Sequence, residues 1–205
     1  MRIVGGKHKG QRIFMPKGSK TRPIANKAKE RLFAVIDNKI PDTKVLDLYA
    51  GTGSIGIEAL SRGAKFVTFV EVNYHAVEVL TKNITSCKEL DNANIIISDS
   101  TKFLKRTKEC YDLIFSAPPY RREFYLEFLN VIDDHPHLLK EDGSIIIECD
   151  KHQRAELSPK NLSKQRDIFH GDTIFEIWSK TLQKTLESPV FTEIVSISVL
   201  SIGNK

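Results

Sequence analysis

The chain has 205 residues, of which 40% are hydrophobic and 28% charged, and its net charge is +5 at pH 7. This composition is typical of one globular domain and excludes a chain that is disordered, collagen-like or coiled-coil throughout. No stretch approaches the roughly 18 uninterrupted apolar residues of a membrane-spanning helix, and the basic N-terminus lacks the apolar segment of a secretory signal. The three cysteines, Cys87, Cys110 and Cys149, form no CxxC pair, so we expect buried, reduced thiols in a cytoplasmic protein, with no disulfide framework and no metal cluster.

The positive charge is concentrated at the N-terminus. Residues 1–40 contain eleven lysines and arginines against two acidic residues, whereas the other 165 residues have a net charge of −4. We expect so basic a segment to bind a polyanion, with nucleic acid as the first candidate and a membrane surface or a simply solvated face as the alternatives. The cations predicted to contact phosphate groups are Lys7, Lys9, Arg12, Lys20 and Arg22.

Two elements are predicted within this basic segment. The short extended pieces Arg2–Val4 and Gln11–Phe14 flank a loop rich in glycine and lysine, which predicts a β-hairpin with a solvated tip. Asn26 is a suitable cap for a helix that runs to about Asp37. The face of this helix that points away from the core is expected to carry its cations, Lys29 among them.

From residue 44 onward, short apolar runs alternate with helical patterns. Strands are predicted over residues 45–49, 66–71, 93–98, 111–116, 143–149, 163–170 and 173–179, with helices over residues 54–62, 74–87, 101–106 and 123–132. Strands that are apolar on both faces and alternate with helices predict a parallel sheet covered on both sides. Only Gly171-Asp172 separates the last two strands, which predicts a hairpin, so one of them should run antiparallel to the rest.

A glycine-rich turn follows the first predicted strand. Residues 45–56 read VLDLYAGTGSIG, a strand that runs into GxGxxG at the start of a helix. Glycines allow the backbone to turn tightly and to approach a ligand, and a helix N-terminus offers free N–H groups. Glu71 ends the second strand twenty residues after Gly51, where a carboxylate can accept hydrogen bonds from a ribose. The sequence therefore predicts a nucleotide cofactor site.

The acidic residues around this turn favour S-adenosylmethionine over NAD. Asp47, near the end of the first strand, would attract the ammonium group of S-adenosylmethionine and repel the pyrophosphate of a dinucleotide. Asp99, at the end of the third strand, is placed to accept a hydrogen bond from the adenine amine. Acidic side chains at the ends of three successive strands suit a ligand with an ammonium, a ribose and an adenine, and NAD remains the alternative.

A second motif, SAPPY, ends the fourth predicted strand at residues 116–120. Two consecutive prolines cannot continue a sheet, and they stiffen the loop. The Tyr120 ring would then project over the sheet edge at which ligands bind in open α/β folds, where it could stack on a base. The alternative is a proline-stiffened turn in which Tyr120 is a packing residue.

Together the two motifs resemble those of amino-methyltransferases with a [D/N/S]-P-P-[Y/F/W] sequence. Further segments narrow the resemblance to the bacterial 16S rRNA guanine-N2 methyltransferase family. These segments are MRIVGGK (1–7), TRP (21–23), KERLF (29–33), LDLYAGTG (46–53), EALSRGA (58–64) and GDT (171–173). The resemblance covers about residues 1–179.

This resemblance implies a Rossmann-like class I methyltransferase fold, with a mostly parallel seven-stranded sheet, one antiparallel strand and an N-terminal β-hairpin extension that helps to bind RNA. It implies methyl transfer from S-adenosylmethionine to the exocyclic N2 amine of a guanine in 16S rRNA, within the assembled small ribosomal subunit, without a metal or a membrane. The regions would be a basic docking segment (1–40), the methyltransferase domain (41–180) and a tail of unknown role (181–205).

Carried over by position, the resemblance also implies roles for single residues. The methionine end of the cofactor would be lined by Asp47, Tyr49, Gly51 and Gly53, the ribose held by Glu71 and the adenine by Asp99. The target base would be held by Ala117, Pro118, Pro119 and Tyr120.

The sequence departs from the family's pattern at Ala117. In that pattern a side-chain acceptor at this position and the carbonyl of the next proline, here Pro118, orient the amine. Alanine has no acceptor, and losing one well-placed polar partner costs about 3 kcal/mol, or about a hundredfold in rate. Three interpretations follow. The enzyme works more slowly through the Pro118 carbonyl, or an irregularity rotates Ser116 into the site, although strand alternation points Ser116 to the opposite face. In the third, the protein is an inactive RNA-binding factor. Methylation of another amine, such as adenine N6 in DNA, is a related alternative.

Overall fold

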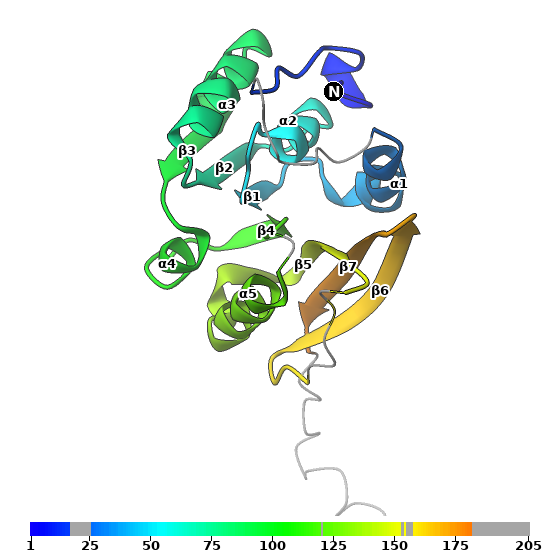
Figure 1. Cartoon of the computed structure of the whole chain (residues 1–205), viewed down its shortest axis with the longest axis vertical. Helices are drawn as coiled ribbons and strands as arrows, with labels where there is room; N and C mark the ends of the chain where they lie inside the picture. Colours follow the sequence, from blue (N-terminus) through cyan, green and yellow to red (C-terminus); the bar gives the residue numbers. More distant parts are fainter. Residues whose placement is uncertain (17–25, 120, 153, 155–157, 182–205) are drawn as a thin grey trace, which may run out of the picture.

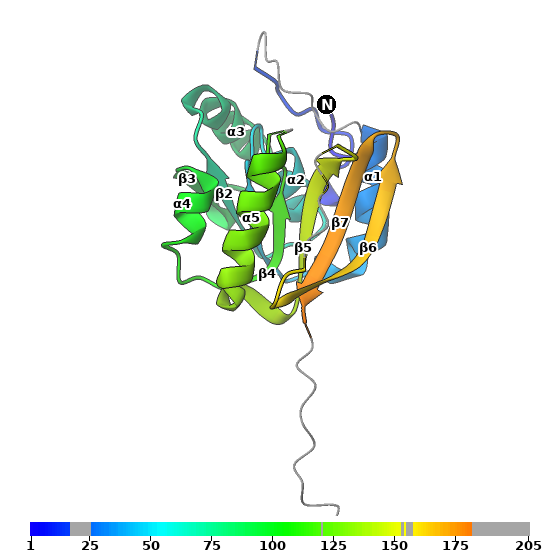
Figure 2. The same ribbon diagram turned by 60° about the horizontal axis from the view of Figure 1, so that its bottom comes forward.

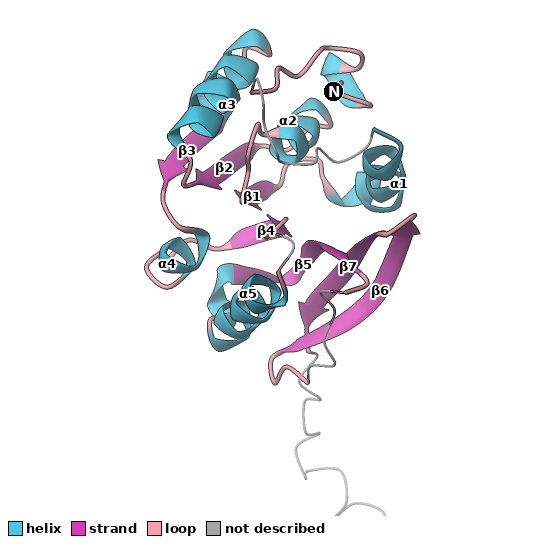
Figure 3. Cartoon of the chain, viewed as in Figure 1, coloured by secondary structure: helices cyan, strands magenta, loops and turns pink. Residues whose placement is uncertain are grey.

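The computed structural model describes residues 1–16, 26–119, 121–152, 154 and 158–181. Within these residues, seven strands form one sheet with helices on both faces (Figures 1 and 3). The strands are β1 (Lys44–Leu48), β2 (Phe66–Glu71), β3 (Ala93–Ile97), β4 (Tyr111–Ser116), β5 (Leu139–Asp150), β6 (Leu162–His170) and β7 (Thr173–Lys180). The α-helices are α1 (Asn26–Ile36), α2 (Ser54–Ser61), α3 (Tyr74–Ser86), α4 (Ser100–Leu104) and α5 (Arg122–Asp134).

The strand order is β3-β2-β1-β4-β5-β7-β6. Strands β1 to β5 pair in parallel, and β7 runs antiparallel to both of its neighbours, β5 and β6. The prediction of a mostly parallel seven-stranded sheet with one antiparallel strand is confirmed. The largest difference in the strands concerns β5, which begins at Leu139 rather than at residue 143.

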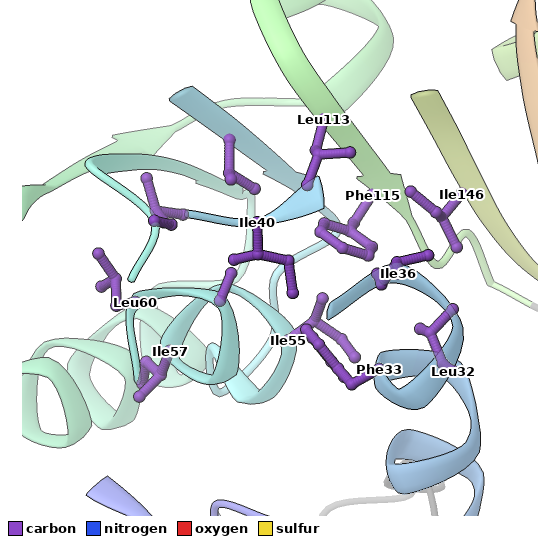
Figure 4. Close-up of a cluster of buried hydrophobic side chains, with 14 of the residues drawn as sticks. Leu32, Phe33, Ile36, Ile40, Ile55, Ile57, Leu60, Leu113, Phe115 and Ile146 are labelled. Atoms are coloured by element: carbon purple, nitrogen blue, oxygen red, sulfur yellow. The ribbon is translucent and has the colours of Figure 1, made fainter. Parts of the chain in front are cut away.

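Two hydrophobic clusters fill the space between the sheet and its helices. Helices α1, α2 and α3 cover one face, and α4 and α5 cover the other (Figures 1 and 2). In the first cluster, Leu32 and Phe33 of α1 meet Ile55 of α2 over Phe115 of β4 and Ile146 of β5 (Figure 4). Each buried side chain of this kind contributes roughly 1.5–3 kcal/mol through removal of apolar surface from water. The carboxyl ends of the parallel strands are thereby held together at one edge.

The N-terminal segment pairs as a minimal hairpin that packs against the domain. Arg2 and Arg12 form an isolated antiparallel bridge, and Ile3 and Ile13 are buried. The expected solvated tip is confirmed at Gly6, Lys7, Lys9 and Gly10, which are exposed, but the base of the loop is bound to the domain. The Ser61 hydroxyl at the end of α2 donates to the Gly5 carbonyl over 2.6 Å and accepts from an N–H of the same loop. The loop is therefore fixed to α2 by hydrogen bonds.

Helix α1 spans Asn26–Ile36, so Asn26 is its first described residue rather than the predicted cap, and Lys29 does not lie on its outer face. Lys29 is fully buried, and its ammonium lies 2.9 Å from the Arg2 carbonyl and 3.1 Å from the Glu58 carboxylate of α2. Burial lowers the pKa of Lys29, against the opposing effect of the Glu58 charge. Glu58 in turn accepts hydrogen bonds from the N–H of Val4 and from Arg62. This network fastens the N-terminal segment to two helices.

Among the residues that the structure describes, no helix has the length and apolar character needed to cross a membrane. The three cysteines are free thiols, of which Cys87 and Cys149 are buried. Cys110 is only half-buried, unlike the expectation for all three.

Lys29→Met should lower the free energy of unfolding by about 3 kcal/mol, because it removes one of the two cations that pair with the buried Glu58 carboxylate and leaves the Arg2 carbonyl without its donor. Urea denaturation measures the effect. Lys27→Met, on the exposed face of the same helix, is the matched control and should change stability by less than about 0.5 kcal/mol. Equal stability of the two variants would show that the buried pair contributes nothing.

Candidate cofactor and substrate site

The Asp47 carboxylate is buried near the end of β1, with 4% of its surface exposed. It accepts a hydrogen bond of 2.9 Å from the N–H of Gly56 in α2. Burial raises the pKa of Asp47 to about 7; the Gly56 hydrogen bond opposes this shift and the nearby negative charge of Glu71 adds to it. Any Cβ at Gly56 would lie 2.3 Å from the Phe69 ring, so only glycine allows α2 to approach the carboxylate this closely. A desolvated carboxylate of this kind would gain from a cationic ligand.

The turn between β1 and α2 uses left-handed backbone conformations at Tyr49, Gly51 and Gly53. The φ angle of Tyr49 is 56°, which is uncommon for a residue with a side chain and is a type of strain that concentrates at functional sites. At Gly53, with φ at 78°, a Cβ would lie 2.3 Å from Leu80. The left-handed backbone conformation therefore favours glycine at positions 51 and 53, and the close contact with Leu80 also excludes a side chain at position 53.

Glu71 holds this turn in place. One of its carboxylate oxygens accepts the N–H of Gly51 over 2.8 Å, and the other accepts the N–H groups of Val72 and Asn73, each over 2.9 Å. A carboxylate has about four acceptor sites. Three are used here, so this geometry leaves about one for a ribose hydroxyl.

Asp99 caps the N-terminus of α4. Its Oδ1 accepts the N–H of Lys102 over 2.9 Å and the hydroxyl of Thr101 over 2.8 Å. Partial burial acts to raise the pKa of Asp99, but these hydrogen bonds outweigh burial and hold the pKa below its usual value. The carboxylate is therefore ionised at neutral pH, as an acceptor for an amine requires. The adjacent Ser100 hydroxyl accepts the N–H of Tyr49 over 3.3 Å, which joins this turn to the β1–α2 turn.

A small cavity, with room for about one water molecule, lies where the two sequence motifs meet. Asp47 of β1 and Ala117, which directly follows β4, line it together with Ser116 and Glu148 of β5. Apolar side chains of α1, α2, β4, β5 and β7 complete the lining: Leu32, Ile55, Phe115, Ile146 and Phe175. Pro118 is buried and Pro119 exposed, whereas Tyr120 lies outside the described residues.

The pairing of β4 with both of its neighbours is regular from Leu113 to Ser116. Ser116 pairs with Leu48 and Ile147, which belong to the cluster under α5, so its side chain is placed on the face opposite to Ala117. Its Oγ is buried and has no hydrogen-bond partner among the described residues. The interpretation that an irregularity rotates Ser116 into the site therefore finds no support.

The pocket also contains a residue that the sequence analysis missed. Glu148 is 6% exposed and belongs to an otherwise apolar stretch of β5, IIIEC. In the sequence, the signal was a glutamate within an apolar strand, because buried charged groups are rare unless they are paired or functional.

The N-terminal segment lies against the cofactor turn. The buried Asn83 side chain of α3 accepts the N–H of Phe14 over 2.8 Å and donates to the carbonyl groups of Phe14 and Thr52 over 3.1 and 2.9 Å. The Met15 sulfur lies 3.8 Å from the Thr52 hydroxyl. The basic segment and the turn of the GxGxxG motif are thus joined through one side chain.

The five predicted phosphate contacts have different surroundings. Lys9 and Arg12 are exposed. Lys7 is also exposed, but its ammonium lies 2.6 Å from the buried Glu89 carboxylate, which also bonds His8. Lys20 and Arg22 lie outside the described residues.

A sheet of this order, with β7 antiparallel and a glycine turn flanked by carboxylates at its carboxyl edge, defines a class I methyltransferase. The family model described as "Conserved hypothetical protein 95" matches residues 1–179. The chain belongs to this family.

Similar proteins agree with this assignment. The chain is 30% identical over 183 residues to "Ribosomal RNA small subunit methyltransferase D" of Escherichia coli, covering 89% of this chain and 91% of that protein. It is 35% identical over 162 residues to the protein of the same name from Buchnera aphidicola, covering 78% and 82%. The solved structure of the Escherichia coli protein yhhF superimposes with a TM-score of 0.79 at 30% identity, covering 89% of this chain and 99% of that one.

Proposed function

We propose that this protein transfers the methyl group of S-adenosylmethionine to the exocyclic N2 amine of a guanine in 16S rRNA, within the small ribosomal subunit. The observation that carries the proposal is the shared pocket of Asp47, from the cofactor strand, and Ala117, from the SAPPY motif. Relatives named for small-subunit rRNA methylation, which match most of the chain, support this class of substrate.

The chain's residues fit a cationic methyl donor. The desolvated Asp47 carboxylate lacks a cationic partner among the contacts described above, and an ammonium group would supply one. The proposed contacts run along the carboxyl edge of β1, β2 and β3. The methionine end is assigned to Asp47, Tyr49, Gly51 and Gly53, the ribose to Glu71, and the adenine to Asp99.

Positioning and electrostatics account for the chemistry. When bound, S-adenosylmethionine supplies an electrophilic methyl group on a positively charged sulfur. The guanine amine is a weak nucleophile because its lone pair is delocalised into the ring, so the chain has to orient that lone pair along the line of transfer. The Pro118 carbonyl, held in a rigid loop, is the proposed backbone acceptor for one amine hydrogen, and Tyr120 the proposed stacking surface. As the C–N bond forms and the C–S bond breaks, fixed acceptors stabilise the positive charge that develops on nitrogen.

One observation favours a second candidate function. Ala117 offers no side-chain acceptor, which would suit an RNA-binding factor that retains the fold without the activity. This candidate differs from the first in a single property, the transfer of the methyl group.

The direct test compares small subunits from cells with and without this protein. Purified protein and S-adenosylmethionine should convert a guanosine of the deficient 16S rRNA to N2-methylguanosine, as detected by mass spectrometry of nucleosides. If the protein binds the subunits but transfers no methyl group, the result supports the second candidate, an RNA-binding factor. If the protein instead methylates adenine in DNA, the substrate is DNA and not rRNA.

Affinity for S-adenosylmethionine should depend on pH through Asp47. The pKa of Asp47 is about 7, and only the ionised form attracts the donor's ammonium, so affinity rises as the pH rises. Between about pH 6 and 7.5 the ionised fraction increases about eightfold, and the association constant should follow it. Above about pH 8 the ammonium itself loses its proton and the gain ends. Calorimetric titration measures this profile, and Asp47→Asn should bind weakly with a flat profile. A flat wild-type profile would contradict the role of Asp47.

Subunit binding should depend on the exposed cations of the N-terminal segment. Replacing Lys9 and Arg12 by alanine should flatten the dependence of log affinity on log salt by roughly 0.7–0.9 for each lost phosphate contact. The matched control replaces Lys65 and Lys108, which are exposed and lie outside the N-terminal segment, just before β2 and β4. Equal salt dependence of binding in the two double variants would show that the basic segment does not contact phosphate groups and is only a solvated surface.

A further inference from the structure

We propose that Glu148 supplies the side-chain acceptor that Ala117 lacks, and that its carboxylate accepts a hydrogen bond from the target amine. This inference deepens the proposed function and rests on it. It assigns a role in methyl transfer to a residue outside both sequence motifs.

The sheet register places Glu148 beside Ala117. In the parallel pairing of β4 with β5, Phe115 pairs with Ile146 and Ser116 with Ile147. Ala117 and Glu148 are the next residues along the two chains. Because paired residues of parallel strands share a face, and both residues line the pocket that also contains Asp47, their side chains approach the same space.

The length of the glutamate side chain suits this role. Neighbouring strands lie about 4.8 Å apart, so an acceptor from β5 has to cross that spacing to serve a base held beside β4. Glutamate is one methylene longer than the aspartate that would occupy position 117 in the family's pattern. The extra methylene covers part of this spacing, so the amine would lie between β4 and β5, where a carboxylate from either strand can reach it.

The other polar residues of the pocket are less suited to this role. Asp47 lies on β1, near the glycine turn, and is assigned to the cofactor's ammonium. The side chain of Ser116 is placed on the α5 face by its pairing with Leu48 and Ile147. Glu148 is the remaining polar side chain of the lining, and it is 94% buried, in an environment where charge-assisted hydrogen bonds are strong.

The proposed step balances in atoms and charge. The guanine N2 lone pair forms a bond to the methyl carbon, and the C–S bond breaks with its electron pair left on sulfur, which becomes a neutral thioether. The methylated nitrogen then carries a positive charge and loses one proton. The Glu148 carboxylate stabilises this charge during transfer, accepts the proton and releases it to water.

The test uses four variants of the full chain, assayed for methyl transfer to deficient small subunits. Glu148→Ala should lower kcat about a hundredfold, and Glu148→Gln, which keeps an acceptor oxygen without the charge, should lower it about tenfold. Affinity for S-adenosylmethionine should stay within about twofold in both. Ala117→Asp in the Glu148→Ala background should restore kcat at least about tenfold, because it returns a carboxylate to the pocket from the other strand. Glu141→Ala, near the start of β5, is the control on the same strand and should leave kcat unchanged.

Rescue across strands distinguishes a catalytic role from a structural one. If Glu148 only stabilises the fold, a carboxylate at position 117 restores nothing, and urea denaturation and donor affinity change together with kcat; this result overturns the inference. Unchanged kcat in both Glu148 variants of an active enzyme overturns it as well, and leaves the proposed function intact. A wild-type chain that transfers no methyl group, and gains activity through Ala117→Asp alone, shows that Glu148 does not serve as the acceptor. A chain that binds no S-adenosylmethionine overturns the proposed function and this inference with it.

Discussion

The carboxyl ends of the parallel strands meet at one edge of the sheet, and this convergence places several carboxylates near one another, of which Asp47 and Glu148 are buried. Asp47 is buried there beside the charge of Glu71, at a free-energy cost that the pKa of about 7 reflects. Backbone N–H groups offset part of this cost: Gly56 donates to Asp47, and Gly51 to Glu71. The N–H groups of the glycine-rich turn therefore stabilise the two carboxylates even without a ligand. The negative charge that remains at this edge is suited to a cation.

The N-terminal segment packs against α2 and against the turn between β1 and α2. Lys29 connects the Arg2 carbonyl to Glu58 of α2, and Asn83 connects Phe14 to the carbonyl of Thr52 in the cofactor turn. The segment expected to dock on RNA is thus packed on the helices that follow the cofactor strands. In the proposed function, this packing keeps a fixed spatial relation between the docked RNA and the methyl donor, as positioning catalysis requires.

The elements that could be predicted have strong local signals. Six of the seven strands begin and end within two residues of their predicted limits, because they combine apolar runs with turns of glycine, proline or aspartate. Asp47, Glu71 and Asp99 were predicted for the same reason, since each lies at a strand end next to a recognisable turn. The buried position of Lys29 was not predicted, because a lysine on a basic helix reads as solvated unless its partner Glu58, twenty-nine residues later, is known.

The amino-acid sequence by itself determined the alternation of strands and helices, the glycine turn, the carboxylates that flank it and the absence of an acceptor at Ala117. These are properties of consecutive residues and of their periodicity. Only the tertiary structure decided that Glu148 shares a pocket with Ala117 and Asp47, and that Ser116 is placed on the other face. The physical reason is that strand register is set by packing over the whole sheet: a shift of one residue would exchange the faces of every side chain on β5.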